Sequence, residues 1–306
     1  MAIRFRFAVA CKLLMAVIVA AIIVSSHTTI NNNNVNNKSM NEQESYTTTN
    51  NKNKKKSMKL LYREDIFVRG WDWDASPIVV ASHKLVFFTL PKVGCTVFKQ
   101  LFRRMMGRDD WKRYQRGSKV HNPLKNGLVY LFDYSIENAS SMLASKEWTK
   151  AIFVREPKER LLSAYLDKVA RNNGSYVVHH CCRKKKSCAP QTMLDFIELS
   201  QNCYDPHWAP QPDRVKHWGI IDFVGSFGNI HNDTKRLLQR IGAWDEFGSY
   251  GWGESGTEEI FGSSRTRHAT GSESLFYEYY TESLERKVEE RYAQDYANEA
   301  ISEKFS

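Results

Sequence analysis

The sequence has only one long apolar run, no internal repeat, and fewer acidic than basic residues. Its 306 residues have room for one sizeable domain or two small ones. Asp and Glu number 34 against 44 Lys and Arg, and the resulting net charge of +10 favours anionic partners in general. A hydrophobic content of 42% supports a globular core and excludes wholesale disorder.

The single apolar run, residues 7–24, follows Arg4 and Arg6 and contains Lys12 near its start. A run of this length behind positive residues predicts an uncleaved membrane anchor, with the bulk of the chain outside the cytosol. The alternative is a signal peptide cleaved at Ser25 or Ser26. Both interpretations send the rest of the chain into the secretory pathway.

The segment 27–58 is rich in Asn, Thr, Ser and Lys and offers almost nothing to bury. Such a segment cannot offset the entropy of ordering, so we expect a disordered stem. The predicted organisation is a cytosolic tail (1–6), a transmembrane anchor (7–24), a low-complexity stem (25–64) and a lumenal domain (65–306).

Four of the six cysteines cluster in one segment: Cys181, Cys182, Cys188 and Cys203. In an oxidising compartment this cluster predicts one or two disulfides that pin a loop. Zinc binding with His179 and His180 is the alternative, although the spacing fits no standard zinc finger. The basic run 183–186 within the cluster is either a solvated face or a loop that grips an acidic polysaccharide.

Short apolar runs alternate with helical periodicity along the rest of the chain. Buried strands are predicted at 84–90, 150–155 and 220–227, and helices at 96–106, 158–171, 232–241 and 281–300. Asn232 or Asp233 is expected to cap the third of these helices. The alternation predicts an α/β domain with a central, mostly parallel sheet flanked by helices. Ligands of such sheets bind at the carboxyl ends of the strands.

The first strand ends in the turn Pro91-Lys92-Val93-Gly94-Cys95-Thr96, directly before a helix. Gly94 permits backbone angles that let successive N–H groups converge on an anion, and the start of the helix adds its dipole. Lys92 supplies a mobile charge and Thr96 a hydroxyl. The Gly-x4-Gly-Lys-Ser/Thr pattern of a Walker A loop is absent. A purely structural strand-to-helix turn is the competing interpretation.

The second strand ends at Arg155, and Ser163 follows eight residues later in the next helix. An arginine fork and a hydroxyl at one strand end suit a second phosphate group. Arg160 either assists them or is a surface cation of the helix.

The two stretches "LPKVGCTVFKQL" and "FVREPKERLLSAYLDK" together resemble the carbohydrate sulfotransferases of the HNK-1 and chondroitin/dermatan 4-O type. The similarity extends over about residues 84 to 296 and includes "DPHWAPQ" (205–211). It implies a P-loop-like sulfotransferase fold and a single-pass type II protein of the Golgi membrane with a lumenal catalytic domain. It also implies the donor PAPS, with PAP as product. The 5'-phosphosulfate would bind Pro91 to Thr96, and the 3'-phosphate Arg155 and Ser163.

The resemblance implies in-line transfer of a sulfuryl group to a glycan hydroxyl, and positioning and electrostatics dominate such chemistry. Lys92 would stabilise charge on the bridging oxygen, and a histidine would take the proton of the acceptor. His121 is the favoured base and His207 the second candidate; a glutamate or another histidine stays open, and either histidine could merely hold a loop. No metal is expected, because Lys, Arg and backbone N–H groups neutralise the donor.

Several positions depart from the family pattern. Glu156 stands where Asp is common, Phe98 stands where Trp is frequent, and a pair of cysteines before "DFVG" and a Phe-Gly-Tyr ending are missing. The donor site is therefore better supported than the acceptor site. The expected acceptor is a glycan, and an acidic one if the basic run 183–186 takes part in binding.

The alternative functions differ in what they need from the sequence. A nucleotide-dependent kinase would need a Walker loop. A non-catalytic, glycan- or polyanion-binding module on the same fold is the main alternative. A lumenal address argues against nucleic acid, and nothing in the sequence indicates an oligomeric state.

Overall fold

The computed structural model describes residues 62–66, 76–112, 119–172, 174–262 and 272–305. All of them belong to one compact unit, Lys54–Ser306. The predicted tail and anchor, and the stem as far as residue 61, lie outside the described residues. Within the described ranges, no helix combines the length and apolar character that crossing a bilayer requires.

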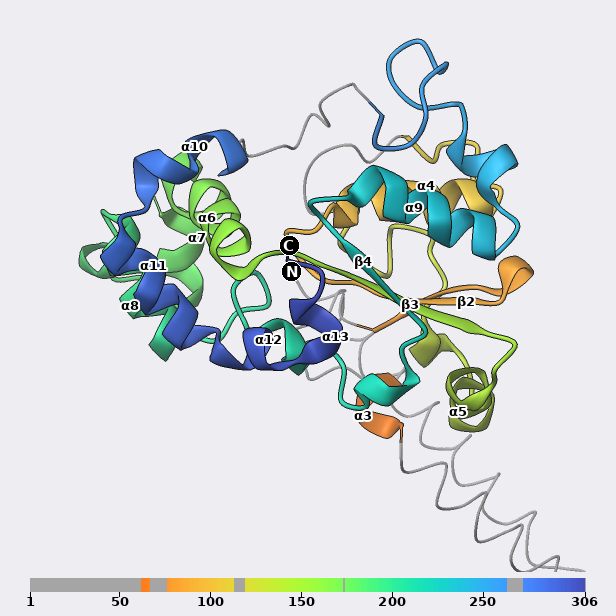
Figure 1. The fold of residues 1–306 in the computed structure, drawn as a ribbon, viewed down its shortest axis with the longest axis horizontal. Coiled ribbons are helices and arrows are strands. Elements are labelled where there is room, and N and C mark those ends of the chain that lie inside the picture. Colours follow the sequence, from red (N-terminus) through yellow and green to blue (C-terminus); the bar gives the residue numbers. More distant parts are fainter. Residues whose placement is uncertain (1–61, 67–75, 113–118, 173, 263–271, 306) are drawn as a thin grey trace, which may run out of the picture. The chain divides into compact units, whose positions relative to one another are not determined.

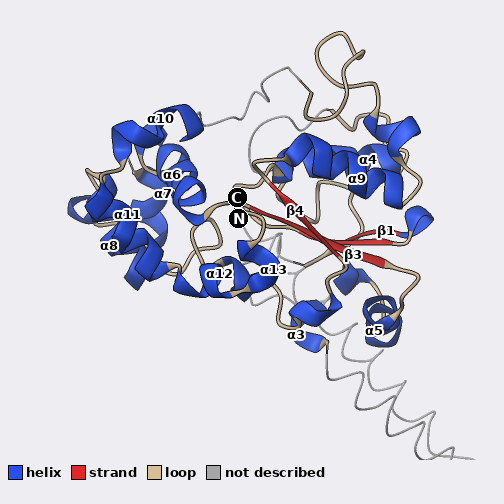
Figure 2. Cartoon of the chain, viewed as in Figure 1, coloured by secondary structure: helices blue, strands red, loops and turns tan. Residues whose placement is uncertain are grey.

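A four-stranded mixed sheet forms the centre of this unit (Figure 2). Its order is β1 (Ile78–Val80), β2 (Leu85–Phe88), β3 (Thr149–Val154) and β4 (Phe223–Ser226). β2, β3 and β4 are parallel, whereas β1 pairs antiparallel with β2. The α/β class and the three predicted strands are confirmed. The edge strand β1 was not predicted, because three residues are too few to show a period.

Helices cover both faces of the sheet (Figure 1). α4 (Cys95–Met105) and α9 (Ile230–Arg240) lie on one face, and α5 (Ile136–Ala144) and α3 (Arg63–Ile66) on the other. Alternation along β2 explains the two cores: Phe87 packs with Phe98 and Phe102 of α4, whereas Val86 and Phe88 pack toward the α3 and α5 side. β1, β2 and β3 are therefore buried on both sides, whereas β4 alternates between buried and half-buried residues.

A third core joins the helices that follow β3. α6 (Pro157–Lys168) contacts α10 (Ser272–Tyr279), α11 (Glu282–Arg291), α7 (Ser175–His180) and α8 (Met193–Asn202). The helix predicted at 281–300 is wrong as one element, because it is divided into α11, α12 (Ala293–Ala297) and α13 (Glu299–Ser302). The chain bends at Tyr292, whose buried hydroxyl donates to the carbonyl of Trp208 at 2.6 Å.

The predicted cap of α9 is also wrong. The helix begins at Ile230, with Asn229 as the preceding residue, so Asn232 and Asp233 lie inside its first turn. Asp233 is buried, and its carboxylate accepts a hydrogen bond from the backbone N–H of Ser226 at 2.7 Å. The side chain thus joins β4 to α9 instead of capping the helix.

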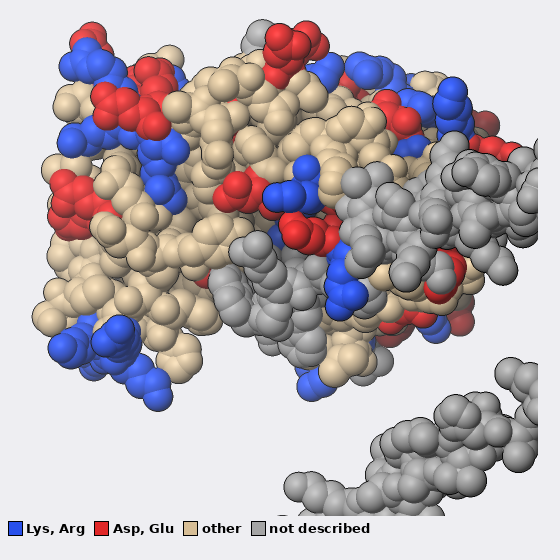
Figure 3. All heavy atoms as spheres, turned by 90° about the horizontal axis from the view of Figure 1, so that it is seen from below, with Lys and Arg blue, Asp and Glu red and all other residues tan. Residues whose placement is uncertain are grey.

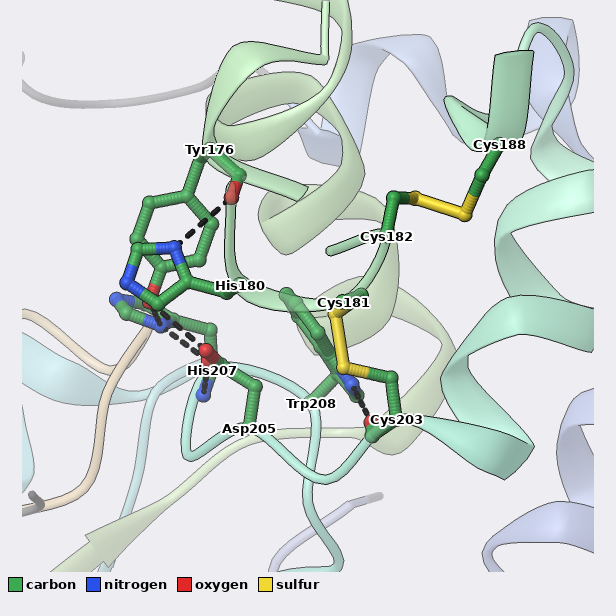
Figure 4. The surroundings of a disulfide bond; sticks show 9 residues. All are labelled: Tyr176, His180, Cys181, Cys182, Cys188, Cys203, Asp205, His207 and Trp208. Atoms are coloured by element: carbon green, nitrogen blue, oxygen red, sulfur yellow. Dashed lines mark hydrogen bonds and ion pairs between the residues drawn. A yellow bond between two sulfur atoms is a disulfide. The ribbon is translucent and has the colours of Figure 1, made fainter. Parts of the chain in front are cut away.

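The cysteine cluster forms two disulfides, Cys181–Cys203 and Cys182–Cys188 (Figure 4). This confirms the disulfide prediction, and the zinc alternative is wrong because all four sulfur atoms are used. Cys181–Cys203 ties the end of α7 to the end of α8. It therefore fixes the loop that begins at Cys203 and continues into "DPHWAPQ".

Removing Cys181–Cys203 is expected to destabilise the fold more than removing Cys182–Cys188. The sequence separations are 22 and 6 residues, so loop-closure entropy assigns them about 3 and about 2 kcal/mol respectively. Denaturant unfolding of the paired Cys→Ser variants without reductant measures both differences. Equal losses would show that strain or residual structure, rather than loop length, sets the contribution of each disulfide.

Candidate functional site

The carboxyl ends of the three parallel strands bring the two sequence motifs together. Lys92 follows β2, Arg155 follows β3 and Phe227 follows β4. The guanidinium of Arg155 donates to the carbonyl of Lys92 at 3.3 Å and lies 4.1 Å from the centre of the Phe227 ring. Because parallel strands end at a common edge, motifs 63 residues apart share one site.

The turn between β2 and α4 has the conformation that convergent N–H groups require. Lys92 and Gly94 have φ angles of 71° and 75°, in the left-handed region. At Gly94 a Cβ atom would lie 2.9 Å from Ile230 Cδ1, so any other residue would strain the backbone and displace the Ile230 side chain. The N–H groups of Cys95 and Thr96 open α4, and no acceptor takes them among the described residues. Open N–H groups at the start of a helix are suited to hold an anion.

Lys92 is the principal cation of this turn. Its ammonium lies 2.9 Å from a carboxylate oxygen of Asp167 on α6, and its side chain is only 12% exposed. Burial lowers the pKa of Lys92, and Asp167 opposes this effect. Burial in turn raises the pKa of Asp167, but the charges of Lys92 and Lys168 outweigh it and bring that pKa down to about 2. Asp167 therefore stays ionised and neutralises Lys92 in this structure.

Arg155 is buried and tightly positioned. Its side chain donates to Ser272 Oγ at 2.8 Å and to Glu159 Oε2 at 3.2 Å. Its backbone is held by Gln211, which accepts from the Arg155 N–H at 2.9 Å and donates to its carbonyl at 2.8 Å. Ser163, the other predicted residue of this motif, lies buried on α6.

Arg160 is not the surface cation that the sequence left open. It is 1% exposed and donates to three carbonyl oxygens, those of Pro91 at 3.2 Å, Pro206 at 2.8 Å and Ala209 at 2.7 Å. Arg160 thus binds the Pro91 turn to the 205–211 loop. Val93, 2% exposed, anchors the same turn in the core.

His207 belongs to a hydrogen-bonded group with Asp205 and Tyr176 (Figure 4). Its Nδ1 lies 2.6 Å from Asp205 Oδ1, and Tyr176 donates to Asp205 Oδ2 at 2.8 Å. Asp205 is buried, whereas the side chain of His207 is 24% exposed. Because the carboxylate accepts from Nδ1–H, Nε2 is left as the basic nitrogen.

Arg160 brings His207 close to the first motif, because it donates both to the carbonyl of Pro91 and to that of Pro206, the residue before His207. Burial lowers the pKa of His207 to about 4, and the positive charges of Lys168 and Lys92 contribute to this decrease, while Asp205 opposes it. His207 is therefore neutral at physiological pH. A neutral imidazole is the form that can accept a proton.

His121 has a different environment. Its Nδ1 lies 3.0 Å from the ammonium of Lys99, which is fully buried on α4. An ammonium group only donates hydrogen bonds, so Nδ1 is the acceptor and Nε2 carries the proton. The lone pair that a general base needs is already engaged by Lys99.

Sequence reasoning missed three supporting residues: Asp167, Tyr176 and Asp205. For Asp205 a signal was available, because it precedes His207 by two residues in "DPHWAPQ". Tyr176 and Asp167 carried none, since their roles depend on how α6 and α7 pack.

Together these features define an α/β protein with Lys92, Arg155 and the start of α4 at the carboxyl ends of its strands, and a carboxylate–histidine pair in the neighbouring 205–211 loop. A model of the sulfotransferase family matches residues 77–298, so the chain belongs to this family. The resemblance to carbohydrate sulfotransferases is thereby confirmed.

Individual relatives are distant. Carbohydrate sulfotransferase 11 of Mus musculus is 25% identical over 226 residues, covering 66% of this chain and 64% of the relative. Carbohydrate sulfotransferase 14 of Danio rerio is 26% identical over 201 residues, 56% of this chain and 52% of the relative. Carbohydrate sulfotransferase 9 of Homo sapiens is 28% identical over 188 residues, which cover 53% of this chain and 40% of the relative. The chain thus spans less than two thirds of the length of these relatives. No solved structure matches it.

Proposed function

We propose that the chain transfers a sulfuryl group from PAPS to a hydroxyl of a glycan. The observation that carries the proposal is the contact between the two motifs, in which Arg155 donates to the carbonyl of Lys92 at the strand edge. Two sets of anion-binding groups then lie side by side, as a donor with separate 3'- and 5'-phosphate groups requires. The names of the relatives support a carbohydrate acceptor.

The residues fit such a donor in charge and position. Pro91 to Thr96 would hold the 5'-phosphosulfate through the turn amides and Lys92. Arg155 and Ser163 would hold the 3'-phosphate, with part of the Arg155 fork turning from Ser272 or Glu159 to the ligand. The donor supplies the activated sulfur–oxygen bond, and no metal is needed to neutralise its charge. A non-catalytic glycan-binding module is less well supported, because it has no use for an imidazole held neutral beside Lys92.

In the proposed reaction the acceptor oxygen attacks sulfur while the bond between sulfur and the bridging phosphate oxygen breaks. The bridging oxygen keeps the electron pair, and Lys92 stabilises the charge that develops there. The proton of the acceptor moves to a histidine. We assign this role to Nε2 of His207 rather than to His121, because Asp205 orients the His207 ring and Lys99 already engages His121.

The cellular setting forms part of the same proposal. An anchor at 7–24 would place the enzyme in the Golgi membrane with residues 65–306 in the lumen. The two disulfides support an oxidising compartment.

Thermal unfolding of the full-length chain with nucleotides tests the donor site. PAP at a hundred times its dissociation constant adds about 2.7 kcal/mol to the stability of the native state. We expect it to raise Tm more than 5'-AMP, which lacks the 3'-phosphate. In Arg155→Gln most of the difference between the shifts with PAP and 5'-AMP should be lost, because the cation that holds the 3'-phosphate is removed and only the Ser163 hydroxyl remains.

Arg240→Gln is the matched control. Arg240 is exposed and donates to the carbonyl of Asp222. Asp222 precedes β4, so it lies at the amino ends of the parallel strands, opposite the proposed donor site. This variant should keep the wild-type difference between PAP and 5'-AMP. A folded wild-type chain with no PAP shift would refute the donor assignment.

A further inference from the structure

Four consecutive cations, Arg183 to Lys186, are exposed in a loop that the proposed reaction does not use. None of them pairs with an acidic side chain among the described residues. Elsewhere many basic side chains lie in ion pairs, as Lys158 does with Glu285 and Glu289. In Figure 3 one corner of the face likewise carries basic side chains without acidic neighbours, while other basic groups are interspersed with acidic ones. A cluster of positive charges without acidic partners attracts polyanions.

The conformation of this basic loop (183–186) is ordered. Arg183 and Lys184 have φ angles of 47° and 66°, which residues other than glycine adopt at a cost in energy. The Cys182–Cys188 disulfide closes the loop, and the N–H of Lys184 donates to the carbonyl of Val178 at 3.0 Å. Surroundings that fix an unfavourable backbone keep the four charged residues together on one loop, and a preformed loop binds its ligand with a smaller loss of backbone entropy.

The loop is covalently tied to the segment that carries His207 (Figure 4). Cys181, two residues before Arg183, is bonded to Cys203, four residues before His207, with 5.6 Å between the two cysteine Cα atoms. At ~3.8 Å per residue, the Cα atoms of Arg183 and His207 are at most about 28 Å apart. The connecting segment also carries Tyr204, which is 61% exposed. An exposed aromatic ring offers an apolar face to a sugar.

We propose that the basic loop is an exosite for an anionic stretch of an extended glycan acceptor. The inference rests on the proposed function, since the reacting hydroxyl must lie at His207 while another part of the same polymer lies at the loop. Once one part of the polymer is bound, the effective concentration of its other part at the second site is raised. An acidic polysaccharide fits best, because it supplies carboxylate or sulfate groups repeatedly along its length and sugar rings for Tyr204.

Binding of unsulfated chondroitin, a polysaccharide with a carboxylate on every second sugar, tests the exosite. A long chain and a tetrasaccharide are titrated into the full-length protein with PAP present, at several salt concentrations. The loop variant Lys184→Asn/Lys185→Gln/Lys186→Gln keeps both disulfides. We expect it to lose about tenfold or more in affinity for the long chain, to lose most of the preference for long over short chains, and to have a shallower salt dependence.

The control variant Lys125→Gln/Lys146→Gln/Lys287→Gln removes the same charge from exposed positions on other elements. It should keep the preference for long chains. An equal loss in both variants would overturn the exosite, since net charge alone would then explain binding, and so would an unchanged loop variant. Failure of the proposed function has a separate signature, namely the absence of a PAP-induced Tm shift in the wild-type protein, whatever the glycan titration shows.

Discussion

Lys92→Met is expected to lower kcat by about two to three orders of magnitude, as the loss of one preorganised donor to a developing charge does. In the structure Lys92 is nearly buried and is neutralised by Asp167. Its charge is needed most when the bridging oxygen of the donor becomes negative, so the loss should fall on kcat more than on the affinity for PAP. Steady-state kinetics with a glycan acceptor, together with PAP-induced Tm shifts, separates these two quantities.

Lys84→Met is the control for this prediction. Lys84 also forms an ion pair, with Glu147 at 2.6 Å, but it immediately precedes β2 and is 55% exposed, so it lies at the strand end opposite the Lys92 turn. Its replacement should change kcat little. If Lys92→Met retained near wild-type kcat, the bridging-oxygen role would be wrong. If it lost only affinity for PAP and kept kcat at saturating donor, Lys92 would be a ground-state contact only.

The central part of the fold could be predicted because its elements carry strong local signals. The segments 84–90 and 150–155 are continuous apolar runs, and both become strands buried on two faces. The turn at Gly94 was predictable for a similar reason, since its position between strand and helix demands unusual backbone angles. In these segments the local sequence pattern is enough to predict the structure, because each residue type matches its burial or its backbone angles.

Other features depend on tertiary contacts that no local pattern encodes. The end of α11 is set by Tyr292, which turns inward to reach the carbonyl of Trp208. Arg160 has the sequence context of an exposed helical arginine, yet three carbonyl groups from two loops surround it. The sequence favours His121 over His207 through its place between the motifs. It gives no sign of the contact with Lys99, which lies 22 residues away in the chain but at hydrogen-bond distance from His121.

His207→Gln is expected to lower kcat by about 10²- to 10⁴-fold, the usual contribution of a general base. Glutamine keeps a side chain of similar size but cannot accept the proton. His121→Gln makes the same chemical change at the histidine engaged by Lys99 and should cost much less activity. Thermal unfolding of both variants with PAP shows whether each still folds and binds nucleotide, so that a loss of kcat can be assigned to the reaction.

The pH dependence of kcat/KM gives an independent test of the same assignment. A base works in its deprotonated form, so activity should fall only as the pH drops through about 4, the pKa of His207. Because the charge of Lys168 lowers that pKa, Lys168→Met should raise it and move the acid limb to higher pH. An acid limb that does not respond to Lys168→Met, combined with a larger loss in His121→Gln than in His207→Gln, would transfer the role of base to His121.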